Sequence, residues 1–179
     1  GFVQVAKNRL RLRRGTFSGE AQVDANALLE FGQSAQFPMN VAGRVTGDGD
    51  ILLSGSTYIT SHLIVPCVFV YSGTHEFVPP LTLGTFIVSN ATQVTIDQQL
   101  TLTGASKFTG LNTVVEGPGL LRNEGTVDLG SAIIRCPVEN AGTWSSTSGS
   151  VPRLVSLFRN LPGGTFTLAQ ASAEFAGPT

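Results

Sequence analysis

The sequence repeats itself at an offset of about 70 residues, and this repetition constrains the fold more strongly than any other feature. Gly15-Thr16-Phe17 recurs as Gly84-Thr85-Phe86, and Val45-Thr46-Gly47 recurs as Val115-Glu116-Gly117. Six matches of this kind occur in order, with offsets between 69 and 72. Ordered matches at a nearly constant offset are typical of stacked structural repeats. We therefore predict a single repetitive domain over residues 1–179.

A shorter rhythm runs inside the long one. Asn123-Glu124-Gly125-Thr126-Val127 and Asn140-Ala141-Gly142-Thr143-Trp144 share the pattern Asn-x-Gly-Thr-apolar at an offset of 17. Asn and Gly tolerate the left-handed backbone of tight corners, after which a new strand can begin. Corners at intervals of roughly 17 to 25 residues predict the coils of a β-solenoid, with about three coils of ~23 residues in each long unit and about eight coils in the chain. The predicted organisation is unit one over about 15–83, unit two over about 84–144, a Ser-rich insertion over 145–153 and a partial third unit over about 154–179.

The composition favours short strands over helices. The chain has 21 Gly and only 13% charged residues, whereas helices normally carry Lys and Glu on their solvent faces. The best helical candidate, Gly19–Phe31, aligns with the Thr- and Val-rich segment Val88–Leu102, so we predict strands in both. Tandem small β-sandwich domains are the alternative all-β fold, although such domains are usually nearer to about 100 residues long and need no coil-sized rhythm.

Two segments, Val45–Gly55 and Asn123–Leu129, resemble the repeats of right-handed parallel β-helix proteins. In style they are similar to the passenger regions of autotransporter adhesins and to pectin-lyase-like β-helices of large extracellular proteins. The resemblance implies an all-β, right-handed parallel β-solenoid in a secreted, extracellular or cell-surface setting. Its motifs are generic, with small residues at corners and aliphatic residues inside, so it implies no particular activity.

The chain has two cysteines, Cys67 and Cys136, which occupy matching positions of successive long units. Three coils of ~4.8 Å would separate them by about 14 Å along the solenoid axis. A disulfide requires Cα atoms within about 7 Å. We therefore expect two separate, buried thiols, with a disulfide as the alternative.

The acidic and histidine residues do not form a recognisable catalytic pattern. Asp48 and Asp50 are the only close pair of acids, and their Gly-rich setting indicates a solvated turn, with a calcium site as the alternative. The two histidines, His62 and His75, are isolated from each other and from Cys. No phosphate-binding or dinucleotide-binding motif is present. We predict no catalytic centre, no metal and no cofactor.

Two surface motifs remain as candidate interaction or modification sites. The alternation in Arg9–Arg14 predicts a strand with leucines inward and arginines outward, and Arg11, Arg13 and Arg14 also resemble a furin-type processing site or a patch for anionic glycans or a subunit. Asn90-Ala91-Thr92 matches the acceptor pattern for N-glycosylation and lies at a predicted corner.

These features predict a structural or adhesive segment of an extracellular assembly that stacks on further copies of itself or on flanking solenoid of a longer polypeptide. Solenoid ends expose unpaired strand edges that must be covered, and the start at Gly1 without Met suggests a processed product or a piece of a longer protein. A glycan-binding or polysaccharide-cleaving β-helix is the alternative. The net charge of −1 disfavours nucleic acid. The longest apolar run, Leu63–Tyr71, is too short to span a membrane and contains Pro66.

Overall fold

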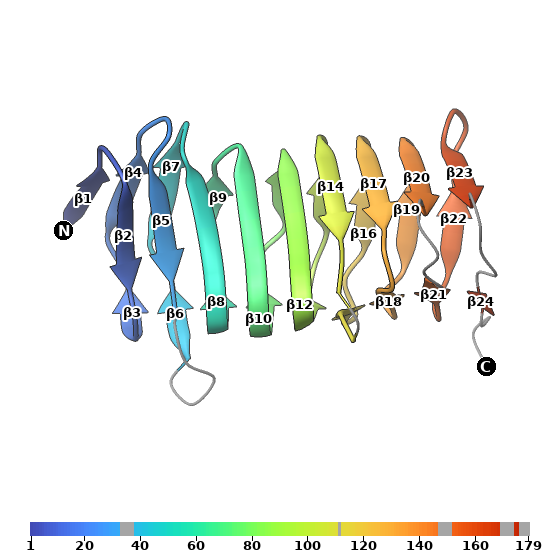
Figure 1. The fold of residues 1–179 in the computed structure, drawn as a ribbon, viewed down its shortest axis with the longest axis horizontal. Coiled ribbons are helices and arrows are strands. Elements are labelled where there is room, and N and C mark those ends of the chain that lie inside the picture. Colours follow the sequence, from blue (N-terminus) through green and yellow to red (C-terminus); the bar gives the residue numbers. More distant parts are fainter. Residues whose placement is uncertain (33–37, 111, 147–151, 169–173, 176–179) are drawn as a thin grey trace.

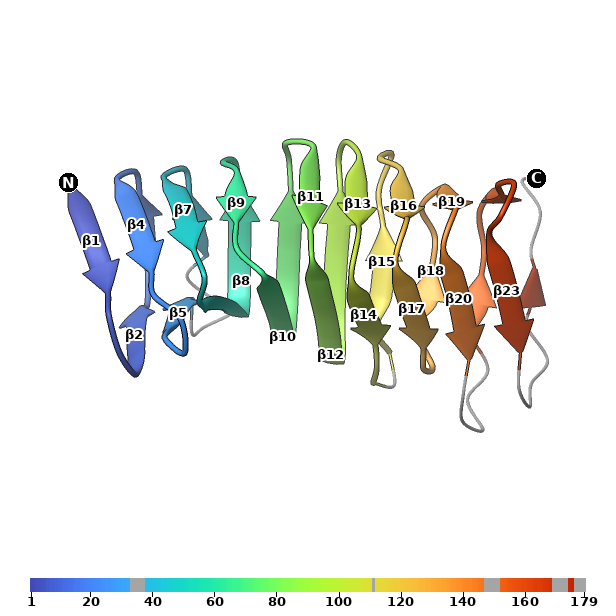
Figure 2. The same ribbon diagram turned by 90° about the horizontal axis from the view of Figure 1, so that it is seen from above.

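The computed structural model is an all-β parallel solenoid of about eight turns, as the sequence predicts. It describes residues 1–32, 38–110, 112–146, 152–168 and 174–175. Successive coils follow one another in sequence order, so the first and last coils lie at opposite ends of an elongated molecule (Figures 1 and 2). Each pairing between neighbouring described strands is parallel, which is incompatible with the antiparallel sheets of tandem β-sandwiches.

Three faces surround the interior, and we name them A, B and C in the order in which the chain visits them. Face A contains β1 (Phe2–Val5), β4 (Glu20–Val23), β7 (Arg44–Gly47) and β9 (Leu63–Ile64), followed by β11 (Leu81–Leu83), β13 (Leu100–Leu102), β16 (Leu121–Asn123), β19 (Val138–Asn140) and β22 (Phe158–Asn160).

Face B contains β2 (Arg9–Leu12), β5 (Leu28–Phe31), β8 (Asp50–Ile59), β10 (Cys67–Phe77), β12 (Thr85–Ile96), β14 (Ala105–Phe108), β17 (Thr126–Leu129), β20 (Thr143–Ser146) and β23 (Thr165–Leu168). Face C contains β3 (Gly15–Phe17), β6 (Met39–Val41), the second halves of β8, β10 and β12, then β15 (Val114–Glu116), β18 (Ile133–Ile134), β21 (Arg153–Leu154) and β24 (Glu174–Phe175). The long strands β8, β10 and β12 therefore run through the corner between faces B and C.

The strand register confirms the short rhythm of the sequence. The offset between neighbours in register is 17 for Leu121 and Val138, and it is 24 for Ala21 and Val45. The shorter offset is a true structural repeat, because Asn123 pairs with Asn140 in adjacent coils.

The same register shows that the predicted long unit does not consist of three whole coils. Phe17 pairs with Val41 on face C, whereas its sequence match Phe86 pairs with Val68 on face B. A coil averages about 20 residues, so an offset of about 70 spans three and a half coils and moves a residue to another face. The matches reflect similar strand-and-corner patterns on different faces. Of the predicted insertion and partial third unit, residues 147–151, 169–173 and 176–179 lie outside the described residues.

Alternation along each short strand builds one continuous core. In β4 the side chains of Ala21 and Val23 are buried while Glu20 and Gln22 are exposed, so the segment predicted as strand rather than helix is confirmed as strand. The interior is filled by aliphatic side chains and by tilted aromatic pairs whose ring centroids lie 5.1–6.0 Å apart. Face-to-edge contacts of this kind stabilise a core beyond the burial of apolar area alone.

A buried asparagine ladder holds the corner between faces A and B in the last coils. Asn123 donates from Nδ2 to Oδ1 of Asn140 at 2.8 Å, and Asn140 donates to Oδ1 of Asn160 at 2.7 Å. Asn123 and Asn140 also donate to the main-chain carbonyls of Thr143 and Thr165, each at 3.0 Å. The ladder thus satisfies polar groups that would otherwise be buried without partners.

The described residues contain no helix that is long and apolar enough to cross a membrane.

Candidate functional site: a basic groove on face B

A groove of about 460 Å³ crosses the outer surface of face B near the N-terminal end. Its walls come from β2, β5, β8 and β10, which are four consecutive strands of the face. The lining residues are Arg9, Arg11, Glu30, Leu52, Ser54, Gly55, Tyr71 and Ser72. With ~4.8 Å between neighbouring strands, the groove extends about 14 Å along the solenoid axis.

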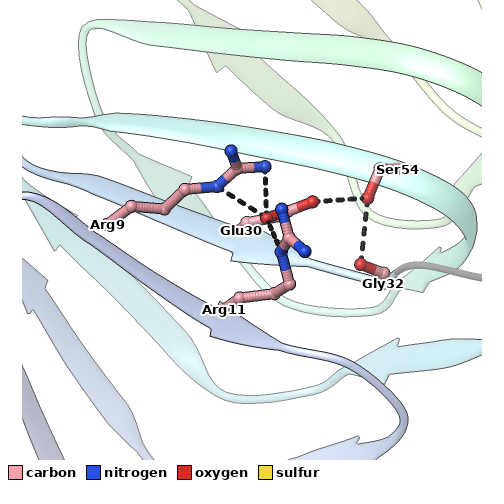
Figure 3. A network of polar contacts seen from close by, with 5 residues as sticks. All are labelled: Arg9, Arg11, Glu30, Gly32 and Ser54. Atoms are coloured by element: carbon pink, nitrogen blue, oxygen red, sulfur yellow. Dashed lines mark hydrogen bonds and ion pairs between the residues drawn. The ribbon is translucent and has the colours of Figure 1, made fainter.

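Strand β2 positions the two arginines. Leu10 and Leu12 pack against the core, and Arg9 and Arg11 face outward, as the alternation predicts. Register places Arg11 beside Glu30 on the next strand. Both guanidinium groups converge on Oε2 of Glu30, with Arg9 Nε at 2.7 Å (Figure 3).

The serine of the third strand completes the network. Ser54 Oγ lies 2.9 Å from Glu30 Oε1 and 2.9 Å from the carbonyl oxygen of Gly32 (Figure 3). Both carboxylate oxygens of Glu30 are therefore engaged, and its side chain is only 4% exposed. The network orders two outward-pointing arginines around one buried carboxylate.

Glu30 remains ionised in this setting. Burial alone raises the pKa of its carboxyl, but hydrogen bonds from Arg11, Ser54 and Arg9, together with the charge of Arg9, outweigh burial and hold the pKa below its usual value. A general acid needs the opposite shift, since it must carry a proton near neutral pH. Two guanidinium charges and one carboxylate leave the groove with a net charge of +1, which suits an anion.

A bend in the long strands sets the opposite wall. The register of β10 against β8 and β12 shifts between Tyr71 and Gly73, and Ser72 and Gly73 have φ values of 55° and 102°. A Cβ atom on Gly73 would collide with the main chain of Gly55, so this close approach requires glycine. The bend leaves Tyr71 51% exposed at the edge of the groove.

The predicted basic patch is therefore divided. Arg11 belongs to the groove network, whereas Arg13 and Arg14 follow the end of β2 and are exposed. Arg14 has an interaction partner of its own.

The cysteines are separate free thiols, but they are not equivalent. Cys67 begins β10 on face B and is half-buried, and burial and the charge of Asp50 raise its pKa to about 11. Cys136 is buried in the corner between β18 and β19, where burial raises its pKa to about 12. The two cysteines match in the sequence because they are separated by the long offset, but residues at this offset lie on different faces.

Asn90 lies at a bend of β12, with an exposed side chain and a φ of 58°. Thr92 of the same acceptor motif is buried, and its hydroxyl contacts the carbonyl of Ser89 while it accepts a hydrogen bond from the main-chain N–H of Ser72 at 3.0 Å. The asparagine side chain is thus accessible, while the threonine stabilises the bend. Glycosylation at Asn90 stays a prediction.

The other polar candidates are distributed over different faces. Asp48 is exposed in the corner between β7 and β8, as expected for a solvated turn. His62 is exposed, and His75 is completely buried. Within the described ranges, no group of three or more His, Cys, Asp and Glu side chains is assembled as a metal site.

A second hollow, of about 490 Å³, lies on face C beside Asn40, Tyr58 and Glu76. Burial, together with the charge of Asp97 and a hydrogen bond to it, raises the pKa of Glu76. This pair was not foreseen, because its members lie on different coils and meet only through the coil register.

The groove residues Glu30, Ser54 and Tyr71 were also missed by sequence reasoning. Arg9–Leu12 was the only detectable part of the site, because its alternation is local. Comparisons with protein-family models, with curated proteins and with solved structures give no match. The parallel β-solenoid fold therefore stands on the structure itself.

Proposed function

We propose that this chain is a structural or adhesive solenoid segment of an extracellular or cell-surface assembly, and that it acts as a stacking scaffold without catalysis. The observation that carries the proposal is that, among the described strands, those at each end of the solenoid are paired on one side only. Similarity in style to autotransporter passengers and pectin-lyase-like β-helices supports the extracellular setting. The partner would be another copy, or flanking solenoid of the same polypeptide.

The first coil has an open edge. Among the described strands, β1 pairs only with β4, β2 only with β5 and β3 only with β6. Carbonyl groups of Gly1 and Val5 accept hydrogen bonds from Glu20 and Asp24, each at 2.9 Å. Because alternate residues of a strand direct their main-chain groups to opposite sides, Gln4 directs its N–H and C=O groups to the free edge. Such groups are a template for another strand.

The core is also incompletely covered at the ends. Val3, Leu10 and Leu12 in the first coil, and Phe158 and Phe166 in the last described coils, are only partly buried. Phe2 is 61% exposed. Stacking of a further coil would bury these apolar groups and pair the edge strands in one step, which gives the association a hydrophobic driving force.

The isolated chain tests this proposal directly. Light scattering coupled to size-exclusion chromatography should show concentration-dependent association, and electron microscopy should show end-to-end rods. Gln4→Pro removes the outward N–H without removing a hydrogen bond to β4, so it should shift the chain toward monomer while circular dichroism is unchanged. Gln4→Thr is the matched control, because it keeps the N–H and also removes the side-chain contact to Asp24.

Two results would overturn the stacking proposal. The first is a wild-type chain that stays monomeric at every concentration. The second is a folded Gln4→Pro variant that associates as strongly as the Gln4→Thr control.

A further inference from the structure

The groove on face B has the chemistry of an anion site, independent of whether the ends stack. Contacts with Glu30 use Nε of both arginines and one terminal nitrogen of Arg9. Each guanidinium carries five N–H donors, so most of the donors are not needed by Glu30. The side chains of Arg9 and Arg11 remain 42% and 34% exposed. A ligand anion can therefore reach both guanidinium groups.

The groove also has an apolar and hydroxyl-bearing part. Tyr71 on β10 offers an exposed aromatic ring, and Leu52 is on β8, the strand that lies between β10 and the strands β2 and β5. A tyrosine presents an apolar ring face together with a polar hydroxyl. Ser54 and Ser72 add hydroxyl groups to the same wall. A ligand that suits this arrangement combines an anionic group with a ring that has an apolar face and several hydroxyls.

Other anionic partners suit the groove less well. An extended peptide adds to a free strand edge, but β5 and β8 are paired on both sides within the sheet. The free edge of β2 directs its main-chain groups along the solenoid axis and not into the groove on the outer face. Nucleic acid needs a basic stripe that follows several phosphates, whereas the chain has a net charge of −1 and one basic cluster. A sulfate ester offers three acceptor oxygens, enough for two guanidinium groups that are already partly engaged.

We propose that the groove formed by Arg9, Arg11, Glu30, Leu52, Ser54 and Tyr71 binds a sulfated saccharide. The sulfate lies against the two guanidinium groups, and a neighbouring sugar ring packs on Tyr71 and Leu52. The carboxylate of Glu30 makes no favourable contact with the anionic ligand. It positions the arginines and partly neutralises them, which sets the affinity at a moderate level.

The opposite effects of two substitutions test this assignment. Arg11→Gln should weaken binding of dextran sulfate about tenfold, because one charge-assisted contact is lost. Glu30→Gln should strengthen binding several-fold, because the buried negative charge is removed and both guanidinium groups are released. If the network had a purely structural role, both variants would bind dextran sulfate more weakly than the wild type. Tyr71→Ser should weaken binding, whereas Tyr58→Ser, which changes an exposed tyrosine outside the groove, should not.

Binding is measured by calorimetric titration at low salt and at roughly fourfold higher salt with dextran sulfate, carboxymethyl dextran and neutral dextran, all of the same length. Strong, salt-sensitive binding of dextran sulfate alone supports the proposal. Equal binding of carboxymethyl dextran overturns the assignment to sulfate, and equal binding of neutral dextran overturns the ionic role of the arginines. Absence of dextran sulfate binding, or unchanged affinity in Arg11→Gln and Tyr71→Ser, overturns the site itself. The last two variants decide the question even where Glu30→Gln does not fold.

Discussion

Acid should destabilise the solenoid through one buried histidine. His75 points into the interior at the corner between faces B and C and is 0% exposed. Its Nδ1 lies 2.7 Å from Thr57 Oγ1, and its Nε2 lies 3.0 Å from the main-chain carbonyl of Ser72. Because a carbonyl can only accept, the neutral ring carries its proton on Nε2 and accepts from the Thr57 hydroxyl at Nδ1. Protonation at Nδ1 would reverse this bond, so that the Thr57 hydroxyl would have to accept and its own hydrogen would need another partner.

Burial lowers the pKa of His75 from 6.5 to about 4, although the bond to Ser72 opposes the shift. The unfolded state then binds more protons than the folded state between these two values. Stability is fully present above the unfolded pKa of 6.5 and is lost as the pH falls toward 4. At about 1.4 kcal/mol for each pH unit between the two pKa values, the loss in the free energy of unfolding is roughly 3 kcal/mol.

Urea denaturation at a series of pH values from 7.5 down to 4 measures this loss. His75→Gln cannot titrate, so the wild type should lose about 3 kcal/mol more than this variant over the range. Carboxyl groups such as Glu30 and Glu76 are present in both chains, so their contributions to the pH dependence cancel when the two chains are compared. His62→Gln, which changes an exposed histidine, should retain the wild-type pH dependence. Identical pH profiles for the wild type and His75→Gln would refute the reasoning.

Two further predictions concern the interior of the last coils and the thiols. Asn140→Leu should lower the free energy of unfolding by about 3 kcal/mol, because the carbonyl of Thr165 and the amides of the ladder lose partners. Asn160→Leu, at the exposed end, should cost less than half as much; equal costs in urea denaturation would contradict the ladder. Iodoacetamide at mildly alkaline pH should modify the native thiols at least about a hundredfold more slowly than the unfolded ones, with Cys67 before Cys136. Intact-mass measurement over time follows the labelling. Rapid labelling of Cys136 in the native chain would contradict the burial of this thiol.

Much of the fold was predictable because the relevant signals are local. Alternation in Arg9–Leu12 correctly indicated which side chains face the core, and the alignment with Val88–Leu102 correctly indicated strands in Gly19–Phe31. The recurrence of Asn123 and Asn140 before Gly-Thr correctly gave the position of a corner and the spacing of one coil. Each of these features depends on a few neighbouring residues, which any sequence displays directly.

The contacts between coils were decided only by the tertiary structure. Coils vary in length because their corners differ, and a shift of a single position in a strand exchanges inward and outward side chains. The partner of a residue in the next coil therefore depends on every corner in between. For this reason the sequence determined a parallel solenoid with arginines on the outside of β2. Only the register brought Glu30 between Arg9 and Arg11 and showed that the long-offset matches, including the two cysteines, join different faces.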